Sequence, residues 1–240
     1  MRSASSPAGA LAAVNAAITG CERCPRLRGY CAAVAREKRA AYRADTYWGR
    51  PVPGFGDPAA RIYILGLAPA AHGANRTGRV FTGDGRGGSG DFLVGALHRA
   101  GLANRATSHA ADDGLRLRDV YIGAAVRCAP PANRPTPAEV AACLDHLDAE
   151  IAALPRLAVV VALGQIAWKA WLDRHARHAP LPRPRPAFGH GAVARLGDGR
   201  ALVGCFHPSR QNTHTGRVTP AMYDALFGGT LRRLLGPARR

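Results

Sequence analysis

The chain has 240 residues, and 47% of them are hydrophobic, which is enough to form one sizeable buried core. Its 33 lysines and arginines outnumber its 16 aspartates and glutamates, so the formal net charge is +17. The apolar content excludes a disordered chain. Since no apolar run approaches the roughly 18 residues of a membrane span, the composition also predicts a chain that does not cross a membrane.

The positive charge is almost entirely arginine, because Lys38 and Lys169 are the only lysines. Codon usage in a GC-rich genome would explain arginine in place of lysine, but it would not explain a twofold excess of bases over acids. From Arg174 to the end, 12 arginines accompany only Asp198 and Asp224. A basic surface of this density predicts a polyanionic partner, and nucleic acid is the partner that we expect.

The first expected element is an Ala-rich helix from about Ala8 to Ile18. Pro7, Asn15 and Thr19 interrupt any apolar run there, which disfavours a signal peptide. The six cysteines are too few and too scattered for the disulfide framework of a secreted protein. We therefore expect a protein of the bacterial cytosol whose thiols are reduced or hold a metal.

Four short apolar runs predict buried strands at residues 61–66, 120–125, 157–163 and 201–206. Further helices are expected at 26–42, 91–99, 136–154, 164–175 and 219–235, and a hairpin around Asp198 and Gly199 before the last strand. The helix at 136 has a Thr136 N-cap, Pro137 and Glu139, which together indicate a capping box. Strands that alternate with helices predict a three-layer α/β/α fold around a central, mostly parallel four-stranded sheet, in a single domain over residues 1–240.

Four cysteines form two pairs that could surround one metal centre. Cys21 and Cys24 are a CxxC pair, whereas Cys128 and Cys143 are separated by fourteen residues. Such thiolates can hold either an iron–sulfur cluster or a tetrahedral zinc ion. Neither spacing is diagnostic, because CxxC alone can be a redox motif and Cys143 can be a small buried helix residue. Cys31 is an alternative ligand, which we interpret as a thiol in a helix core.

Two loops that follow predicted strands carry clusters of polar side chains. The loop from Gly66 to Asp84 contains an aromatic residue, two arginines and a carboxylate, and the loop from His207 to Arg217 is almost entirely polar, basic or glycine. Ligands of parallel sheets bind at the carboxyl ends of the strands. We therefore expect both loops to contribute to one site. A solvated turn with incidental histidines is the alternative, which the presence of two such loops disfavours.

These loops, with the segment between them, resemble the signature of the iron–sulfur uracil-DNA glycosylases of type 5. The motifs that carry the resemblance are Gly66-Leu-Ala-Pro69, His72-Gly-Ala-Asn-Arg-Thr-Gly-Arg79, Phe81-Thr-Gly-Asp84, Arg127-Cys-Ala-Pro-Pro-Ala-Asn133 and His207-Pro-Ser-Arg-Gln-Asn-Thr213. The related type 4 enzymes have an acidic residue soon after the first motif, where this chain has Ala70-Ala71-His72. Two departures are Ala70 in place of the usual glycine, and apparent insertions at residues 85–90 and 104–118.

The resemblance implies a DNA repair enzyme that flips uracil, and also deaminated or modified bases such as hypoxanthine, out of DNA and hydrolyses the glycosidic bond to leave an abasic site. Asp84 would stabilise the cationic sugar or orient water, and His207 would donate to the departing base. The resemblance alone assigns Asn133 to the reacting centre. It also implies a structural [4Fe–4S] cluster, and we expect a monomer acting on DNA that contains uracil or other deaminated bases. The remaining predicted residues are Gly66, Leu67, Ala68, Phe81 and His72 for substrate binding, Arg76, Arg79, Arg210, Gln211 and Arg217 for DNA binding, and Cys21, Cys24, Cys128 and Cys143 for the cluster.

Two other functions stay open at this point. A non-catalytic, metal-containing protein that binds DNA damage would explain the charge and the cysteines, but not a carboxylate and a histidine at strand ends. A related glycosylase that traps uracil-DNA covalently would carry an Arg-rich loop with a histidine nucleophile, and no such run is evident in this chain.

Overall fold

The computed structural model describes residues 6–236, which fold around a six-stranded sheet with the strand order β1-β3-β2-β4-β6-β5. Its four central strands run parallel to one another, and they are β2 (Ile62–Gly66), β3 (Val120–Ala124), β4 (Val159–Leu163) and β6 (Ala201–Cys205). These are the four strands that the apolar runs predicted. The α/β fold class is confirmed.

Two short antiparallel strands make the sheet larger than the predicted four strands. β1 (Phe55–Gly56) pairs with β3 at one edge, and β5 (Val193–Arg195) pairs with β6 at the other. The sequence does not predict β1, because a two-residue strand among glycines and prolines has no periodicity to detect. β5 and β6 are the two arms of the predicted hairpin, which is confirmed.

Every residue of the four central strands is buried. Since successive side chains of a strand point to opposite faces, each strand supplies both cores of the molecule. In β2, for example, Ile62 and Ile64 enter one apolar cluster, whereas Tyr63 and Leu65 enter the other. This explains why the strands read as continuous apolar runs in the sequence.

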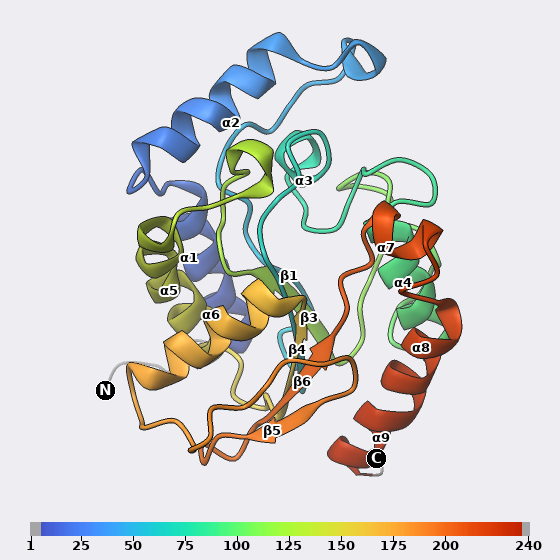
Figure 1. Cartoon of the computed structure of the whole chain (residues 1–240). Helices are drawn as coiled ribbons and strands as arrows, with labels where there is room; N and C mark the ends of the chain where they lie inside the picture. Colours follow the sequence, from blue (N-terminus) through green and yellow to red (C-terminus); the bar gives the residue numbers. More distant parts are fainter. Residues whose placement is uncertain (1–5, 237–240) are drawn as a thin grey trace.

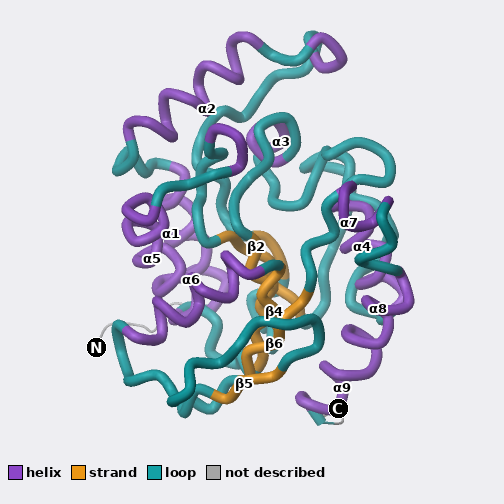
Figure 2. The backbone as a smooth tube through the Cα atoms, in the orientation of Figure 1, coloured by secondary structure: helices purple, strands orange, loops and turns teal. Residues whose placement is uncertain are grey.

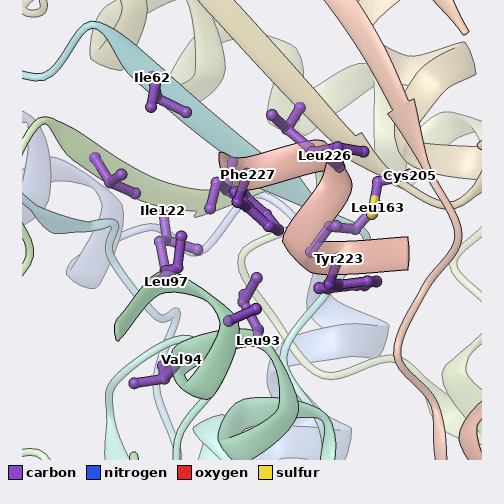
Figure 3. Packing of buried hydrophobic residues seen from close by; sticks show 14 of the residues in the cluster. Ile62, Leu93, Val94, Leu97, Ile122, Leu163, Cys205, Tyr223, Leu226 and Phe227 are labelled. Carbon is purple, nitrogen blue, oxygen red and sulfur yellow. The ribbon is translucent and has the colours of Figure 1, made fainter. Parts of the chain in front are cut away.

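One face of the sheet is covered by α4 (Ser89–Arg99) and by the C-terminal helical segments α8 (Pro220–Asp224), a π-helical stretch (Ala225–Thr230) and α9 (Leu231–Leu235). Figure 3 shows Leu93 and Leu97 of α4 with Phe227 of the π-helical stretch, packed in one cluster with Ile62 and Ile122 of the sheet. The helix predicted at 219–235 therefore forms, but with a wider turn in its middle.

The opposite face is covered by α1 (Pro7–Thr19), α5 (Pro137–Ala152) and α6 (Gln165–Ala176), so the sheet lies between two helical layers (Figure 1). The predicted capping box begins α5: the Thr136 side chain accepts from the Glu139 amide, and the Glu139 carboxylate accepts from the Thr136 amide. Among residues 6–236, no helix is both long and apolar enough to cross a membrane.

The connections at the carboxyl ends of the central strands are long loops that contain short helical turns (Figure 2). These turns are α3 (Ala74–Thr77), a 3-10 turn at Pro131–Asn133 and α7 (Arg210–His214). α2 (Pro25–Glu37) lies over the same end of the molecule (Figure 1). It is shorter than the predicted helix, because Lys38 takes a positive φ of 54° that ends it, and a separate 3-10 turn follows at Ala40–Tyr42.

A buried ion pair joins α5 to the segment that follows β3. The guanidinium of Arg127 donates to both carboxylate oxygens of Glu150 at 2.9 and 2.6 Å, and the two side chains are 1% and 0% exposed. The Tyr63 hydroxyl and the Gly54 amide donate to the same carboxylate. Glu150, in α5, thus connects β2, the segment after β3 and the chain directly before the edge strand β1.

Replacing Glu150 by Gln is expected to lower the free energy of unfolding by about 3–5 kcal/mol, because the Arg127 charge would stay buried without its partner. Urea denaturation monitored by circular dichroism measures this loss. Asp224→Asn is the control, since it breaks the half-exposed Arg99–Asp224 pair and is expected to cost less than about 1 kcal/mol. Equal losses in the two variants would contradict the assigned role of Glu150.

Candidate active site

A cavity of about 480 Å³ lies at the carboxyl ends of the central strands. The loops after β2, β3 and β6 line it, as does the start of α6 directly after β4. Its lining includes Leu67, Ala68, Phe81, Asp84, Asn133, Gln165, Ile166, His207 and Arg210. The structure therefore brings the three predicted catalytic residues and the predicted aromatic residue to one cavity, although their roles stay predictions.

Phe81 forms one wall of this cavity in a backbone conformation that few residues adopt. Its φ is 50°, in the left-handed region. A Cβ at Gly66 would lie 2.9 Å from the Phe81 ring, so only glycine at that position leaves the ring its place. Gly66 was predicted to bind substrate; it does not line the cavity and instead supports Phe81 from behind. The rings of Phe81 and His207 have centroids 6.0 Å apart.

The carboxylate of Asp84 is packed against glycine backbone. A Cβ at Gly73 would overlap its Oδ1, and a Cβ at Gly88 would come within 2.7 Å of its Cβ. Burial raises the pKa of Asp84 to about 6; the Gly90 amide and the charge of Arg210 oppose this shift without cancelling it. Asp84 is therefore a carboxylate at neutral pH, and keeping it ionised in this environment lowers the stability of the folded protein.

His207 follows β6 and faces the same cavity. Burial lowers the pKa of its imidazole to about 4, which keeps the ring neutral at physiological pH. Its backbone is held by the Asn212 side chain, which donates to the His207 carbonyl at 2.8 Å. Ser209 caps α7 by accepting from the Asn212 amide. A neutral imidazole on a fixed loop can donate one N–H to a ligand in the cavity.

Asn133 stands at the mouth of the cavity on the turn after β3. Ala132 and Asn133 both have positive φ, of 51° and 55°, and the Asn133 amide donates to the Pro130 carbonyl at 3.1 Å. Asparagine is one of the few residues that take this conformation readily. The side chain is exposed, so it is available to a ligand.

Arg79 does not face DNA, and the prediction that it contacts phosphate is wrong. Its side chain is buried, and it donates to Thr82, Ser108 and Asp113 and to the Ala111 carbonyl. These partners lie beside Phe81 and in the predicted insertion at 104–118. Arg79 therefore fixes the turn that presents Phe81, and the insertion supplies its counter-charge.

Arg76 is also used inside the protein. It donates to the carbonyls of His72 and Gly83, pairs with Asp45 and lies 4.0 Å from the centroid of the Tyr42 ring. Its side chain is 12% exposed and its donors are used within the protein, so the phosphate contact of Arg76 stays a prediction that these contacts disfavour. By contrast, three other residues predicted to bind DNA are exposed, and they are Arg210, Gln211 and Arg217.

A second cavity, of about 510 Å³, adjoins the first, and His72 lines this one instead of the first. The two cavities share Ala70, Asp84, Asn133 and Arg210. Residues from the N-terminal part of the chain also line it, namely Tyr30, Arg39 and Tyr42. Sequence analysis missed these three, because no local motif links this part of the chain to the loops that follow the strands. It also missed Gln165 and Ile166, although Gly164 directly follows a predicted strand and was a usable signal.

Five cysteines gather where α2, the segment after β3 and α5 meet. Cys24, Cys31, Cys128 and Cys143 belong to one apolar cluster, and the thiol of Cys21 is near enough to raise the pKa of both Cys24 and Cys143 beyond what burial does. Cys31 donates to the Ala129 carbonyl at 3.6 Å. All six cysteines are free thiols. Within residues 6–236, no three His, Cys, Asp or Glu side chains converge as closely as a single metal ion requires.

Comparison with known proteins decides the family. Residues 53–228 match the model of the uracil-DNA glycosylase superfamily. A type-5 uracil-DNA glycosylase from Mycobacterium bovis is 53% identical over 221 residues, which cover 92% of this chain and 80% of the relative. The chain belongs to the uracil-DNA glycosylase superfamily.

Within this superfamily, the chain is more similar to the type-5 than to the type-4 relatives compared with it. The type-5 uracil-DNA glycosylase of Thermus thermophilus is 52% identical over 206 residues, or 86% of this chain and 90% of the relative. A type-4 uracil-DNA glycosylase from Pyrobaculum aerophilum is 33% identical over 199 residues, or 80% of this chain and 90% of the relative. The resemblance inferred from the loop motifs is therefore confirmed.

The raised pKa of Asp84 predicts how stability depends on pH. The folded protein holds this proton more tightly than the unfolded chain, so its stabilising effect is complete below about pH 4 and is lost as the pH rises through 6. In the wild type, this loss of unfolding free energy between pH 4 and pH 8 is expected to be roughly 3 kcal/mol. Asp84→Asn is expected to abolish it, because asparagine does not titrate. Urea denaturation of both proteins across this range measures the difference. Parallel pH profiles would show that Asp84 is not desolvated.

Proposed function

We propose that this protein removes uracil from DNA by hydrolysing its N-glycosidic bond, leaving an abasic site. The observation that carries the proposal is the convergence of an aromatic ring, a desolvated carboxylate and a neutral imidazole in one cavity. Type-5 uracil-DNA glycosylases that share about half of its residues support the same substrate.

The cavity suits a base that has been flipped out of the duplex. The ring of Phe81 offers a face on which the base stacks, and Leu67 and Ala68 line the same space with apolar groups. A volume of about 480 Å³ lies within the roughly 300–1,000 Å³ of small-molecule pockets, which is more than one pyrimidine ring requires. We therefore propose that larger deaminated bases such as hypoxanthine are also accepted.

The departing uracil carries negative charge, which a hydrogen-bond donor stabilises as it develops. His207 supplies such a donor. Because its pKa is held near 4, the imidazole is neutral before the reaction and needs no proton from solvent. The hydrogen bond strengthens as the oxygen of the base becomes anionic, so it favours the transition state over the bound substrate.

The sugar develops positive charge when the bond to the base breaks. Asp84 is the carboxylate that can stabilise this charge or accept a proton from the attacking water. Since Asp84 is partly desolvated, its negative charge interacts more strongly with a nearby cation than a solvated carboxylate would. Asn133 also lines the cavity, and its amide can hold the sugar or the water.

The exposed side chains around the cavity suit a DNA backbone. Arg210, Gln211 and Arg217 belong to the loop after β6, and a net charge of +17 attracts DNA of any sequence. Contacts to phosphate position the substrate without selecting a sequence, which is what a repair enzyme needs.

We also propose that Cys21, Cys24, Cys128 and Cys143 hold a structural [4Fe–4S] cluster. Thiolates are the donors that such a cluster takes, and these thiols lie close enough to influence one another. Cysteines that form no disulfide, together with a DNA substrate, favour the cytosol as the site of action.

Excision from a duplex with one U·G pair, followed by alkaline strand cleavage, tests the proposed activity. Asp84→Asn and His207→Ala are each expected to slow single-turnover excision by at least about 100-fold, while DNA binding changes only a few fold. The wild-type rate is expected to fall below about pH 6, as Asp84 becomes protonated.

The same assay separates the alternatives. Binding without any cleavage would indicate a protein that only recognises damage, and a complex that survives denaturing electrophoresis would indicate covalent trapping. A parallel duplex with hypoxanthine in place of uracil tests the wider substrate range. Loss of binding with intact excision in either variant would remove Asp84 or His207 from its assigned role.

The cluster ligands can be tested with two cysteine variants. Cys143→Ala is expected to lose most of the iron of anaerobically purified protein and much of its solubility, because one of four ligands is missing. Cys31→Ala is the matched control, since Cys31 is buried in the same apolar cluster and is expected to leave the iron content unchanged. Iron analysis and the visible absorption spectrum measure both. Iron loss in Cys31→Ala alone would exchange the two assignments.

A further inference from the structure

The second cavity has a chemistry of its own. It lies between the loop after β2 and the segment that joins α2 to the 3-10 turn at Ala40–Tyr42, two parts of the chain that meet at the end of the molecule over which α2 lies (Figure 1). The exposed side chains of Arg39 and Arg210 contribute two positive charges to its lining. Asp84, at the boundary with the first cavity, is the only carboxylate among the described residues that line it. This balance favours an anionic ligand.

His72 adds a neutral donor to this cavity. The hydroxyl of buried Tyr47 accepts from the Arg39 amide at 3.4 Å and lies 3.0 Å from Nδ1 of His72. Within residues 6–236 this hydroxyl has no other acceptor, so it donates its proton to Nδ1. The imidazole proton of His72 is therefore on Nε2, which has no protein partner in the described part of the chain. Burial and the charges of Arg39 and Arg76 lower the pKa of His72, which keeps the ring neutral.

Aromatic side chains complete the cavity. Tyr42 is held by the guanidinium of Arg76, which lies 4.0 Å from its ring centroid. Its hydroxyl and the guanidinium of Arg210 both approach the backbone at Gly85, where a Cβ would lie 3.8 and 3.1 Å from them. Tyr42 and Arg210, which are far apart in the sequence, thus both lie near Gly85, and both line the cavity. Tyr30 lines it as well. Aromatic rings beside positive charges are typical of sites for single-stranded nucleotides.

The position of Asp84 links the two cavities. Because Asp84 and Asn133 line both, a nucleotide whose sugar lies between them would place its base in the first cavity and its backbone in the second. A volume of about 510 Å³ is far more than an attacking water needs. It is large enough for a phosphodiester and part of a neighbouring nucleotide.

We propose that the second cavity binds the phosphodiester next to the flipped uracil, with Arg39, His72 and Arg210 donating to its oxygens. The proposal rests on the proposed excision of uracil. It adds a subsite to which Arg39 contributes from outside the matched residues 53–228 of the superfamily model, whereas His72 and Arg210 lie inside them.

Chemical neutralisation of single phosphates tests this subsite. Duplexes with one U·G pair carry a methylphosphonate in place of the phosphate on the 5′ or the 3′ side of uracil, and kcat/KM is compared with that of the unmodified duplex. In the wild type, one of the two replacements is expected to lower kcat/KM at least about tenfold, the effect of losing charge-assisted hydrogen bonds. In Arg39→Gln this penalty is expected to be smaller by a factor of about five.

Arg36→Gln is the matched control. Arg36 is an exposed arginine in the last turn of α2 and does not line the cavity, so this variant is expected to show the wild-type penalty. Equal penalties in Arg39→Gln and the wild type, or no penalty at either phosphate, would overturn the proposal.

A binding measurement keeps this test separate from the excision activity. The same phosphate replacements in a duplex with an abasic-site analogue are compared by fluorescence anisotropy, and the affinities are expected to follow the same pattern. Failure of the proposed function would appear differently, as an unmodified duplex that the wild type binds but does not cleave.

Discussion

The buried ion pair between Arg127 and Glu150 is the interaction on which the arrangement of the site depends. Its charges are removed from water, so they are stable only while every partner stays in place. Glu150 also accepts from Tyr63 of β2 and from the Gly54 amide, and the Arg127 carbonyl accepts from Val52. The chain continues from Arg127 directly into Cys128 and then to the turn of Asn133. One pair of charges therefore aligns the sheet, the cysteine cluster and one lip of the active site.

Desolvation acts in opposite directions on the two groups that we assign to catalysis. It raises the pKa of Asp84 because it disfavours an anion, and it lowers the pKa of His207 because it disfavours a cation. Between about pH 6 and 8 the site therefore holds a carboxylate and a neutral imidazole. In the proposed mechanism, the carboxylate would stabilise positive charge on the sugar, and the imidazole N–H would stabilise negative charge on the base. One apolar cavity produces both states, and the folded protein loses some stability to keep Asp84 ionised there.

The arginines of this chain have two uses that composition cannot separate. Arg79 and Arg127 are buried and pair with carboxylates, and the side chain of Arg76 is largely enclosed. Arg39 and Arg210, by contrast, are exposed at the second cavity. The charge excess predicted a nucleic-acid partner correctly as a class, because a net charge is a property of composition alone. It did not predict which arginines are available, because that depends on where the sixteen acidic residues lie in space.

The sequence by itself determined the four parallel strands, most of the helices and the loops that form the cavity, since apolar runs, caps and glycine turns are local signals. Long motifs around Asp84, Asn133 and His207 also determined the family. Only the tertiary structure decided that β1 and β5 extend the sheet, that Gly66 supports Phe81, and that Arg76 and Arg79 point inward. The tertiary structure alone showed that Arg39 and Tyr42 line the second cavity. These outcomes depend on contacts between segments distant in the sequence, and burial and charge pairing arise only when those segments meet.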